Sequence, residues 1–348
     1  MPELPEVEVI RQGLAQAVNG ARVASVDVLD VRALKRHQSG DASPEHDFAA
    51  RLTGATLGAP ARRGKFLWVP LDPGPAGSVA PTALDATALD ATALDATALD
   101  ATALDATGAA PTEQMPATAA PTTALLGHLG MSGQMLLRTL EQPDDRHVRV
   151  RAWLDTREHG ELRLDFCDQR LFGSLALDEL VATDDGEAAG WGSEHALIPG
   201  QAAHIARDPL DPVFDAERVL EQFARRRVHV KKALLDQRIV SGIGNIYADE
   251  ALWLARVHPE TPAANLSRQA ARRLLDAVHG VLEKALAEGG TSFDELYVNV
   301  NGESGYFAHS LNAYGRGGEA CSRCDGVIKR IPFAGRSSHF CPRCQPRR

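Results

Sequence analysis

The sequence has 348 residues and lacks any run approaching the roughly 20 consecutive apolar residues that a membrane-spanning helix needs. Its first residues, from Met1 to Glu6, lack the basic start and apolar core of a secretory signal peptide. These two absences argue against membrane insertion and export, and they predict a cytoplasmic protein. The hydrophobic fraction of 44% can still supply a sizeable core, in two ordinary domains or in one with appendages.

The chain also lacks a net positive charge, because 37 basic side chains face 46 acidic ones and leave a balance of −9. This excludes a uniformly basic surface but not nucleic-acid binding, which depends on how charge is distributed. Two segments are locally basic: 224–238, where six basic residues face only Asp236, and 311–348, where eight face two acidic residues. Such runs are commonly solvated faces, but two of them in an acidic protein favour a phosphate-binding surface.

Part of the acidity lies in a low-complexity segment. Between Thr82 and Ala106 the pentapeptide Thr-Ala-Leu-Asp-Ala occurs five times, inside a stretch rich in Pro, Ala, Thr and Gly. A period of five residues advances about 500° around a helix, so the leucines form no apolar stripe. We therefore expect residues 72–122 to be a solvated, largely disordered insertion between two strands, with a partner-binding element as the alternative.

The remaining pattern changes from strands to helices along the chain. A short amino-terminal helix is expected from Pro5, and strands are expected at 23–28, 66–69, 125–129, 148–154 and 162–166. Asp, Gly and Pro then accumulate at 182–212, which reads as a linker. Helices are expected at 215–227, 230–237, 246–256 and 267–287. The pattern predicts an α+β protein with an antiparallel β-sandwich in its first half.

Four cysteines near the end of the chain carry the strongest chemical signal. Cys321, Cys324, Cys341 and Cys344 form two Cys-x2-Cys pairs that can complete the tetrahedral sulfur shell of one zinc ion. The tail is too short for a core of its own, so the metal would supply folding energy. An iron site and two disulfides are the alternatives. Cys167 stands alone between strand residues and is expected to be a buried apolar side chain.

The amino terminus offers a reactive group. A small second residue normally allows removal of Met1, which would leave Pro2 with a free secondary amine. The pKa of an α-amino group is about 7.7 to 8, against about 10.4 for lysine, so much more of it is unprotonated at neutral pH. Such an amine can attack a carbonyl-like carbon and form an iminium, and Glu3 lies next to it to move protons. Composition alone would favour an ordinary proline before a helix.

Five separated blocks change that reading, because the sequence resembles the formamidopyrimidine-DNA glycosylases, bacterial enzymes that excise oxidised purines. The blocks are Pro2 to Glu8, Arg62 to Lys65, His128 to Gly133, Gly242 to Ala248, and Gly305 to Arg316 leading into the cysteine tail. They occur in the family's order and span nearly the whole chain. The resemblance implies a catalytic β-sandwich domain at 1–190 with the insertion at 72–122. A helix-two-turn-helix domain with its linker would follow at 191–310, and a zinc finger at 311–348.

The resemblance also implies catalytic roles for four residues. Pro2 would attack C1′ of the damaged nucleotide, and Glu3 would protonate the sugar oxygen or relay protons during ring opening. Lys65 would contact phosphate near the lesion and aid elimination. Arg336, between the two cysteine pairs, would grip the phosphates flanking the flipped nucleotide and take part in the second elimination.

An enzyme that acts on a base must remove it from the stack, and the family fills the gap with apolar wedges and an arginine. Met131, Phe172 and Arg170 match these groups. The family pattern here is Asp-Pro-Arg-Arg-Phe-Gly, whereas this chain has Asp168-Gln169-Arg170-Leu171-Phe172-Gly173. The missing proline and second arginine leave open the loop's geometry and its reading of the opposite base.

The remaining DNA-binding residues are carried over from the family in the same way. The resemblance assigns backbone contacts to His147, Arg226, Lys231 and Asn245, and it assigns to Glu6 a role in supporting the site through hydrogen bonds. The segment 296–304 occupies the place of the loop that covers the extruded purine.

We therefore expect a bifunctional DNA glycosylase and apurinic/apyrimidinic lyase that removes 8-oxoguanine and formamidopyrimidines in base excision repair. It would act as a monomer on damaged double-stranded DNA, with one structural Zn²⁺ and no membrane partner, in the cytoplasm and on the nucleoid. The rivals are an endonuclease VIII-type glycosylase for oxidised pyrimidines and a noncatalytic protein that binds damaged DNA. Leu4 and the long loop at 296–304 favour the first over the pyrimidine enzyme, and retention of Pro2, Glu3 and Lys65 argues against the noncatalytic protein.

Overall fold

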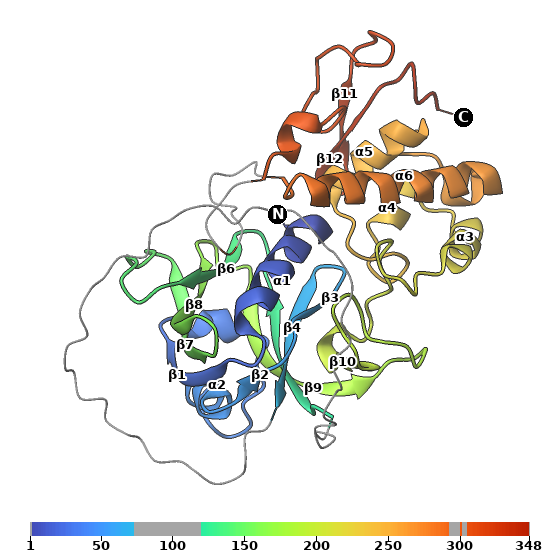
Figure 1. The fold of residues 1–348 in the computed structure, drawn as a ribbon. Helices are drawn as coiled ribbons and strands as arrows, with labels where there is room; N and C mark the ends of the chain where they lie inside the picture. Colours follow the sequence, from blue (N-terminus) through green and yellow to red (C-terminus); the bar gives the residue numbers. More distant parts are fainter. Residues whose placement is uncertain (1, 73–119, 292–299, 301–304, 348) are drawn as a thin grey trace, which may run out of the picture. The chain divides into compact units, whose positions relative to one another are not determined.

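The structure is a computed structural model that describes residues 2–72, 120–291, 300 and 305–347. Apart from its ends, the expected insertion at 72–122 lies outside the described residues, and so does the expected loop at 296–304 apart from Val300. Along the chain, a strand-rich amino-terminal half precedes a helical region and a short carboxyl-terminal hairpin (Figure 1).

The amino-terminal half is an antiparallel sheet of ten strands with two helices, α1 (Leu4–Val18) and α2 (Pro44–Leu52). The strands are β1 (Arg22–Val28), β2 (Thr56–Leu57), β3 (Ala61–Arg63), β4 (Phe66–Asp72), β5 (Thr123–His128), β6 (Gly133–Arg138), β7 (Val148–Thr156), β8 (Gly160–Asp168), β9 (Ser174–Ala182) and β10 (Leu197–Pro199). Their order is β10-β9-β5-β4-β2-β1-β7-β8-β6, and β3 pairs with β4 beside this path. The predicted α+β class and antiparallel sheet are confirmed, and each predicted strand overlaps an observed one.

The core of this half lies between α1 and the sheet. Pro5 stands in the first turn of α1, where its missing N–H costs nothing, and Val7, Ile10 and Leu14 follow at helical spacing. These three side chains are at most 1% exposed and share one apolar cluster with Leu67 of β4 and Val150 of β7. Burying each of them stabilises the fold by about 1.5 to 3 kcal/mol.

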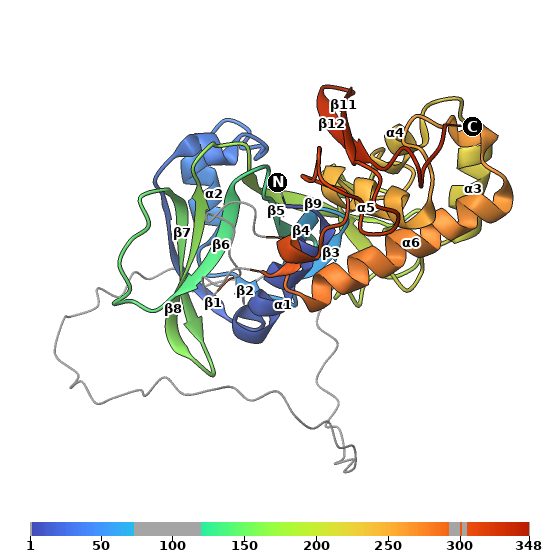
Figure 2. The ribbon, with the colours of Figure 1, turned by 90° about the horizontal axis from the view of Figure 1, so that it is seen from above.

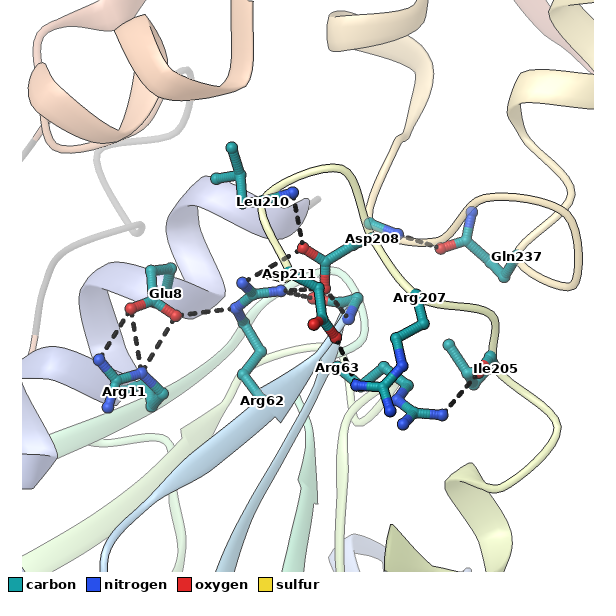
Figure 3. A network of polar contacts seen from close by, with 12 residues as sticks. Glu8, Arg11, Arg62, Arg63, Ile205, Arg207, Asp208, Leu210, Asp211 and Gln237 are labelled. Atoms are coloured by element: carbon teal, nitrogen blue, oxygen red, sulfur yellow. Dashed lines mark hydrogen bonds and ion pairs between the residues drawn. The ribbon is translucent and has the colours of Figure 1, made fainter. Parts of the chain in front are cut away.

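The segment at 182–212, predicted to be a linker, is tied to the sheet by charged side chains (Figure 3). Arg62 is fully buried between Glu8 of α1 and Asp208, with both ion pairs at 2.8 Å. Arg207 pairs with Asp211 at 2.9 Å. Removing one partner of such a buried pair leaves an uncompensated charge, so the network fixes where the chain leaves the sheet.

The helical region consists of α3 (Ala216–Ala224), α4 (Val230–Leu234), α5 (Asn245–Ala255) and α6 (Arg268–Ala287). Ten of the eleven residues of α5 are buried, which is typical of a helix surrounded by protein. Helix α6 packs along it (Figure 2). Leu4 at the start of α1 belongs to this second core, and its N–H donates to the carbonyl of Gly242 at 3.0 Å. The start of the chain is thus built into the helical region.

The carboxyl-terminal hairpin pairs β11 (Lys329–Phe333) with β12 (Arg336–Phe340). Ala334 and Gly335 form its turn with φ of 45° and 76°, a left-handed conformation that suits a two-residue hairpin. The buried carboxylate of Asp249 on α5 accepts from Ser338 Oγ and from the N–H of His339, both at 2.8 Å. The hairpin is therefore anchored to α5. Among the described residues, no helix is long and apolar enough to cross a membrane.

Candidate active site and DNA-binding surface

The side chain of Glu3 caps the first turn of α5. Its carboxylate, 2% exposed, accepts hydrogen bonds from the amides of Gly244 at 2.6 Å, Ile246 at 3.0 Å and Tyr247 at 3.4 Å. The free N–H groups and the partial positive charge of a helix amino terminus favour a carboxylate at this position. A residue at the start of the chain thus takes the capping position of a helix more than 240 residues away.

The glycines of the Gly242-Ile243-Gly244 connection make this approach possible. A Cβ atom on Gly244 would lie 2.2 Å from Cδ of Glu3, which no side chain tolerates. Gly242 has φ of +85°, and a Cβ there would lie 2.5 Å from Cδ1 of Leu4. Both positions require glycine because the amino-terminal segment lies directly against the backbone.

Lys65 faces the same carboxylate. Its Nζ donates to the carbonyl of Ile243 at 2.8 Å. Burial raises the pKa of Glu3, and the positive charge of Lys65 opposes that rise. Burial lowers the pKa of Lys65, while the charge of Glu3 raises it and that of Arg336 lowers it further. The pKa of Glu3 is thus shifted upward and that of Lys65 downward, both in the direction of neutral pH. Such shifts suit groups that give and take protons in one reaction.

The buried carboxylate of Glu6 accepts hydrogen bonds from Glu3, Tyr247 and Thr291. Its Oε1 accepts from the hydroxyl of Tyr247 at 2.5 Å and from N and Oγ1 of Thr291 at 2.7 and 2.9 Å. Its Oε2 accepts from the N–H of Glu3 at 2.8 Å. Burial raises the pKa of Tyr247 well above its ordinary value, so the phenol stays a donor. Glu6 is 3% exposed, and these hydrogen bonds join it to Glu3, Tyr247 and Thr291.

Arg336 extends the site from the carboxyl-terminal hairpin. It is exposed and follows directly after the tight turn at Ala334 and Gly335. Its charge is one of those that lower the pKa of Lys65. Pro2 is buried beside Glu3. Of the four expected catalytic residues, Glu3 and Lys65 both bond to the connection that precedes α5, and Arg336 lies on the hairpin that Asp249 anchors to the same helix.

The structure corrects the expectation for Lys231. This side chain is fully buried, and its ammonium pairs with Asp249 at 2.7 Å and donates to the carbonyl of Ser337 at 3.0 Å. Asn245 Nδ2 donates to the same carbonyl at 3.0 Å. Lys231 therefore does not offer a surface charge to a DNA phosphate. It fixes the hairpin that carries Arg336, because a buried carboxylate such as Asp249 requires a paired cation.

Met131 and Phe172, the two expected wedges, project from neighbouring loops and are 40% and 55% exposed. The loops touch at their backbones, since a Cβ on Gly130 would lie 2.3 Å from the carbonyl carbon of Phe172. Arg170, between β8 and β9, is exposed as well. Large apolar side chains exposed at loop tips beside an arginine are suited to entering a base stack.

His147 and Arg226, two of the expected backbone contacts, belong to different parts of the fold. The carbonyl of His147 accepts from the N–H of Asp168 at 3.0 Å, so His147 lies at the end of β8, where the loop with Arg170 begins. Arg226 follows α3, is half-buried and donates to Oε1 of Gln222 at 3.2 Å. Within the described part of the chain, no contact brings Arg226 to the residues around Glu3.

The four cysteine sulfurs of the tail lie within 4.8 Å of one another. A tetrahedral zinc site with Zn–S bonds of about 2.3 Å places its sulfurs about 3.8 Å apart, so this cluster fits one ion. The indole N–H of Trp253 on α5 donates to Sγ of Cys321 at 3.4 Å, the kind of outer contact that orients a metal thiolate. Cys167 is 4% exposed and outside the cluster, as predicted.

Sequence reasoning missed three residues that hold the site together. Tyr247 lies inside a quoted motif, but nothing in the sequence says that its hydroxyl meets Glu6. Asp249 follows two residues later and, with its neighbour Glu250, places acids in a mostly apolar helix, which is the available signal for a buried charge. Asp168 precedes the Arg170 loop and is fully buried, where its carboxylate accepts from backbone amides.

These features define a buried cluster of titratable groups at the start of the chain and a four-cysteine cluster at its end. Residues 1–175, 205–295 and 318–347 match, in turn, the formamidopyrimidine-DNA glycosylase N-terminal domain, the H2TH domain of the same enzymes and the zinc finger found in FPG and IleRS. The chain belongs to the formamidopyrimidine-DNA glycosylase family.

Individual relatives agree over the full length. The chain is 49% identical to the formamidopyrimidine-DNA glycosylase of Leifsonia xyli subsp. xyli, over 99% of both chains. Among solved structures, it resembles the Lactococcus lactis Fpg bound to DNA with an abasic site and the same protein bound to DNA with Fapy-dG. In both cases the TM-score is 0.69 and the identity 26%, covering 99% of this chain and 100% of the other.

Proposed function

We propose that this chain excises oxidised purines through a covalent iminium between the Pro2 amine and C1′ of the damaged nucleotide, followed by β,δ-elimination. Its family membership makes it a DNA-formamidopyrimidine glycosylase and DNA-(apurinic or apyrimidinic site) lyase of base excision repair. The observation that carries the mechanism is the position of Glu3, buried on the amino terminus of α5 next to Pro2 and facing Lys65.

In the first step the Pro2 nitrogen attacks C1′, the glycosidic C–N bond breaks, and the departing base takes up the proton that the Pro2 nitrogen loses. Glu3, whose pKa is raised by burial, would deliver a proton to the sugar ring oxygen. Ring opening then leaves C1′ and Pro2 joined as an iminium cation. The iminium acidifies a proton on C2′, and loss of that proton breaks the C3′–O bond and expels the 3′ phosphate. The iminium is then conjugated with the new C2′–C3′ double bond, so the C4′ proton becomes acidic, and its loss breaks the C5′–O bond and expels the 5′ phosphate.

Lys65 and Arg336 assist these departures. Lys65 is the cation that faces Glu3, and its lowered pKa lets it exchange a proton as the sugar opens. The planar guanidinium of Arg336 suits two phosphate oxygens at once, and the hairpin turn and the Asp249 anchor hold it in place. When bound, the Zn²⁺ ion supplies no reactive water, because four cysteines complete its shell.

The DNA surface follows from the same reading. Met131, Phe172 and Arg170 would fill the gap left by the flipped nucleotide, with His147, Asn245 and Arg226 along the backbone. We propose a monomer acting on damaged double-stranded DNA in the cytoplasm, on the nucleoid.

An excision assay separates this reading from its rivals. Duplexes with 8-oxoguanine, a formamidopyrimidine, thymine glycol or an abasic site are incubated with the purified protein, and base release and strand cleavage are followed separately. The proposal requires the purine lesions to be excised faster than thymine glycol. Preference for thymine glycol would favour the endonuclease VIII-type reading, and tight binding without release or cleavage would favour a noncatalytic protein.

A further inference from the structure

The loop with Arg170 and Phe172 contains an unusual backbone conformation. Leu171, between them, has φ of 55°. This left-handed region favours glycine, because a Cβ atom crowds the neighbouring carbonyl. Leu171 stands where the family pattern has the second of two arginines.

Hydrogen bonds to the buried side chain of Asp168 hold the two ends of the loop. The fully buried carboxylate of Asp168 accepts from the amide of Gly173 at 2.7 Å and from that of Arg170 at 3.1 Å. It also accepts from the hydroxyl of Ser132 at 2.5 Å, which joins it to the loop of Met131. These bonds fix the two ends of the loop but leave its middle residue, Leu171, to other contacts.

The middle is held from outside by Lys35. Its Nζ donates to the carbonyl oxygen of Leu171 at 2.7 Å, across 136 residues of sequence. Lys35 directly follows the 3-10 helix η1 (Val31–Leu34), whose Ala33 and Leu34 are buried, so the start of its side chain is firmly placed. A hydrogen bond from an ammonium to a carbonyl is stronger than a neutral one, and this one fixes the direction of the peptide after Leu171.

The charge of Lys35 also acts on a residue of the sheet. Burial, together with the charges of Arg36, Lys65 and Lys35, lowers the pKa of His128 at the end of β5 to about 4. Lys35 and Lys65 therefore act on one imidazole, although they come from different elements.

We propose that Lys35 is a positioning residue that sets opposite-base specificity. By holding the Leu171 carbonyl, it keeps the left-handed turn that presents Arg170 and Phe172 on the two sides of the loop. The inference rests on the proposed function, because Arg170 is taken there as the side chain that reads the base opposite the lesion.

The test compares Lys35→Met, which keeps the apolar stem but removes the donor, with Lys35→Arg, which restores a cationic donor. Arg32→Met is the matched control, since Arg32 is an exposed cation on the same 3-10 helix and pairs with Asp30 instead. Single-turnover excision of 8-oxoguanine opposite cytosine and opposite adenine gives the discrimination ratio. Equilibrium binding to both duplexes and thermal unfolding are measured alongside.

We expect Lys35→Met to reduce the discrimination ratio by about three- to tenfold, with a smaller effect on average binding, as for loss of a base-reading geometry. Lys35→Arg should recover most of the ratio, and Arg32→Met should leave it unchanged. An unchanged ratio in Lys35→Met, with binding weakened equally on both duplexes, would reduce Lys35 to a phosphate contact and overturn the inference. Absence of 8-oxoguanine excision by the unaltered protein would instead refute the proposed function.

Discussion

The carboxylate of Glu3 lies 2.6 Å from the amide nitrogen of Gly244, at the amino terminus of α5. The same helix anchors the carboxyl-terminal hairpin through Asp249, and it donates to a cysteine of the zinc cluster through Trp253. One buried helix therefore positions the proton-carrying group, the hairpin with Arg336 and the metal site. The packing of α5 therefore determines how Glu3, the hairpin and the cysteine cluster are placed relative to one another.

Gly244→Ala should impair excision, because the added Cβ would lie 2.2 Å from Cδ of Glu3 and must displace the carboxylate. We expect the single-turnover rate to fall by about tenfold to a hundredfold, within the range for a misplaced general acid. Gly280→Ala is the matched control, since a Cβ there meets no atom within 4 Å and alanine favours the interior of α6. A folded Gly244→Ala protein with normal excision would show that the contact does not matter.

His128 should make stability depend on pH. Its pKa is lowered to about 4 by burial, against an ordinary value near 6.5, so the unfolded chain binds a proton more readily than the native one. The associated stability is present above pH of about 6.5 and is lost as the pH falls toward about 4, on the order of 2 kcal/mol. Urea unfolding of His128→Gln across this range should show a flatter pH profile than the unaltered chain. If stability depends on pH in the same way in both proteins, His128 is not the source of the pH dependence.

Lys231→Met should lower the stability of the protein rather than remove a charge that contacts DNA. It leaves the buried carboxylate of Asp249 without its cation, and we expect a loss of about 3 kcal/mol in unfolding free energy. Its neighbour Lys232 is exposed, so Lys232→Met is the matched control and should leave stability nearly unchanged. Affinity is then measured against salt concentration. A slope smaller by about 0.9 in Lys231→Met, with normal stability, would restore the phosphate contact first expected for this residue.

Cys341→Ser should release zinc and weaken DNA binding while the amino-terminal sheet stays folded. The cysteine belongs to the four-sulfur cluster, and the hairpin with Arg336 ends next to it. Metal analysis, circular dichroism and duplex binding decide this. Cys167→Ala is the matched control: it removes a buried cysteine outside the cluster, and the variant protein should keep its zinc. Full zinc content and normal affinity in Cys341→Ser would mean that the cluster is not the metal site.

The sequence predicts the parts of this protein better than their contacts. Helical spacing in α1 and the cysteine spacing are local patterns, and both lead directly to observed features. Short strands such as β2, with two residues, carry too little pattern to be found. Lys231 was misplaced because its neighbours are basic, and a charge cluster looks like a surface until its buried partner, Asp249, is known.

The site depends on contacts that sequence periodicity cannot show. The motif around Gly244 suggests a phosphate-binding helix terminus, yet in this structure that terminus is occupied by Glu3. Only the fold brings these residues together, because they are separated by 241 positions. The Leu171 turn is a similar case, since the donor to its carbonyl is Lys35, which lies in a segment with no motif.

The most direct test of the account is borohydride trapping with DNA that contains 8-oxoguanine. If the Pro2 amine attacks C1′, reduction of the iminium gives a stable covalent adduct, and mass spectrometry should place it on a peptide that begins at Pro2 and lacks Met1. A protein with an uncleaved amino-terminal extension should form no adduct and should not cut the strand. An adduct on Lys65, or robust excision by the extended protein, would contradict Pro2 as the nucleophile.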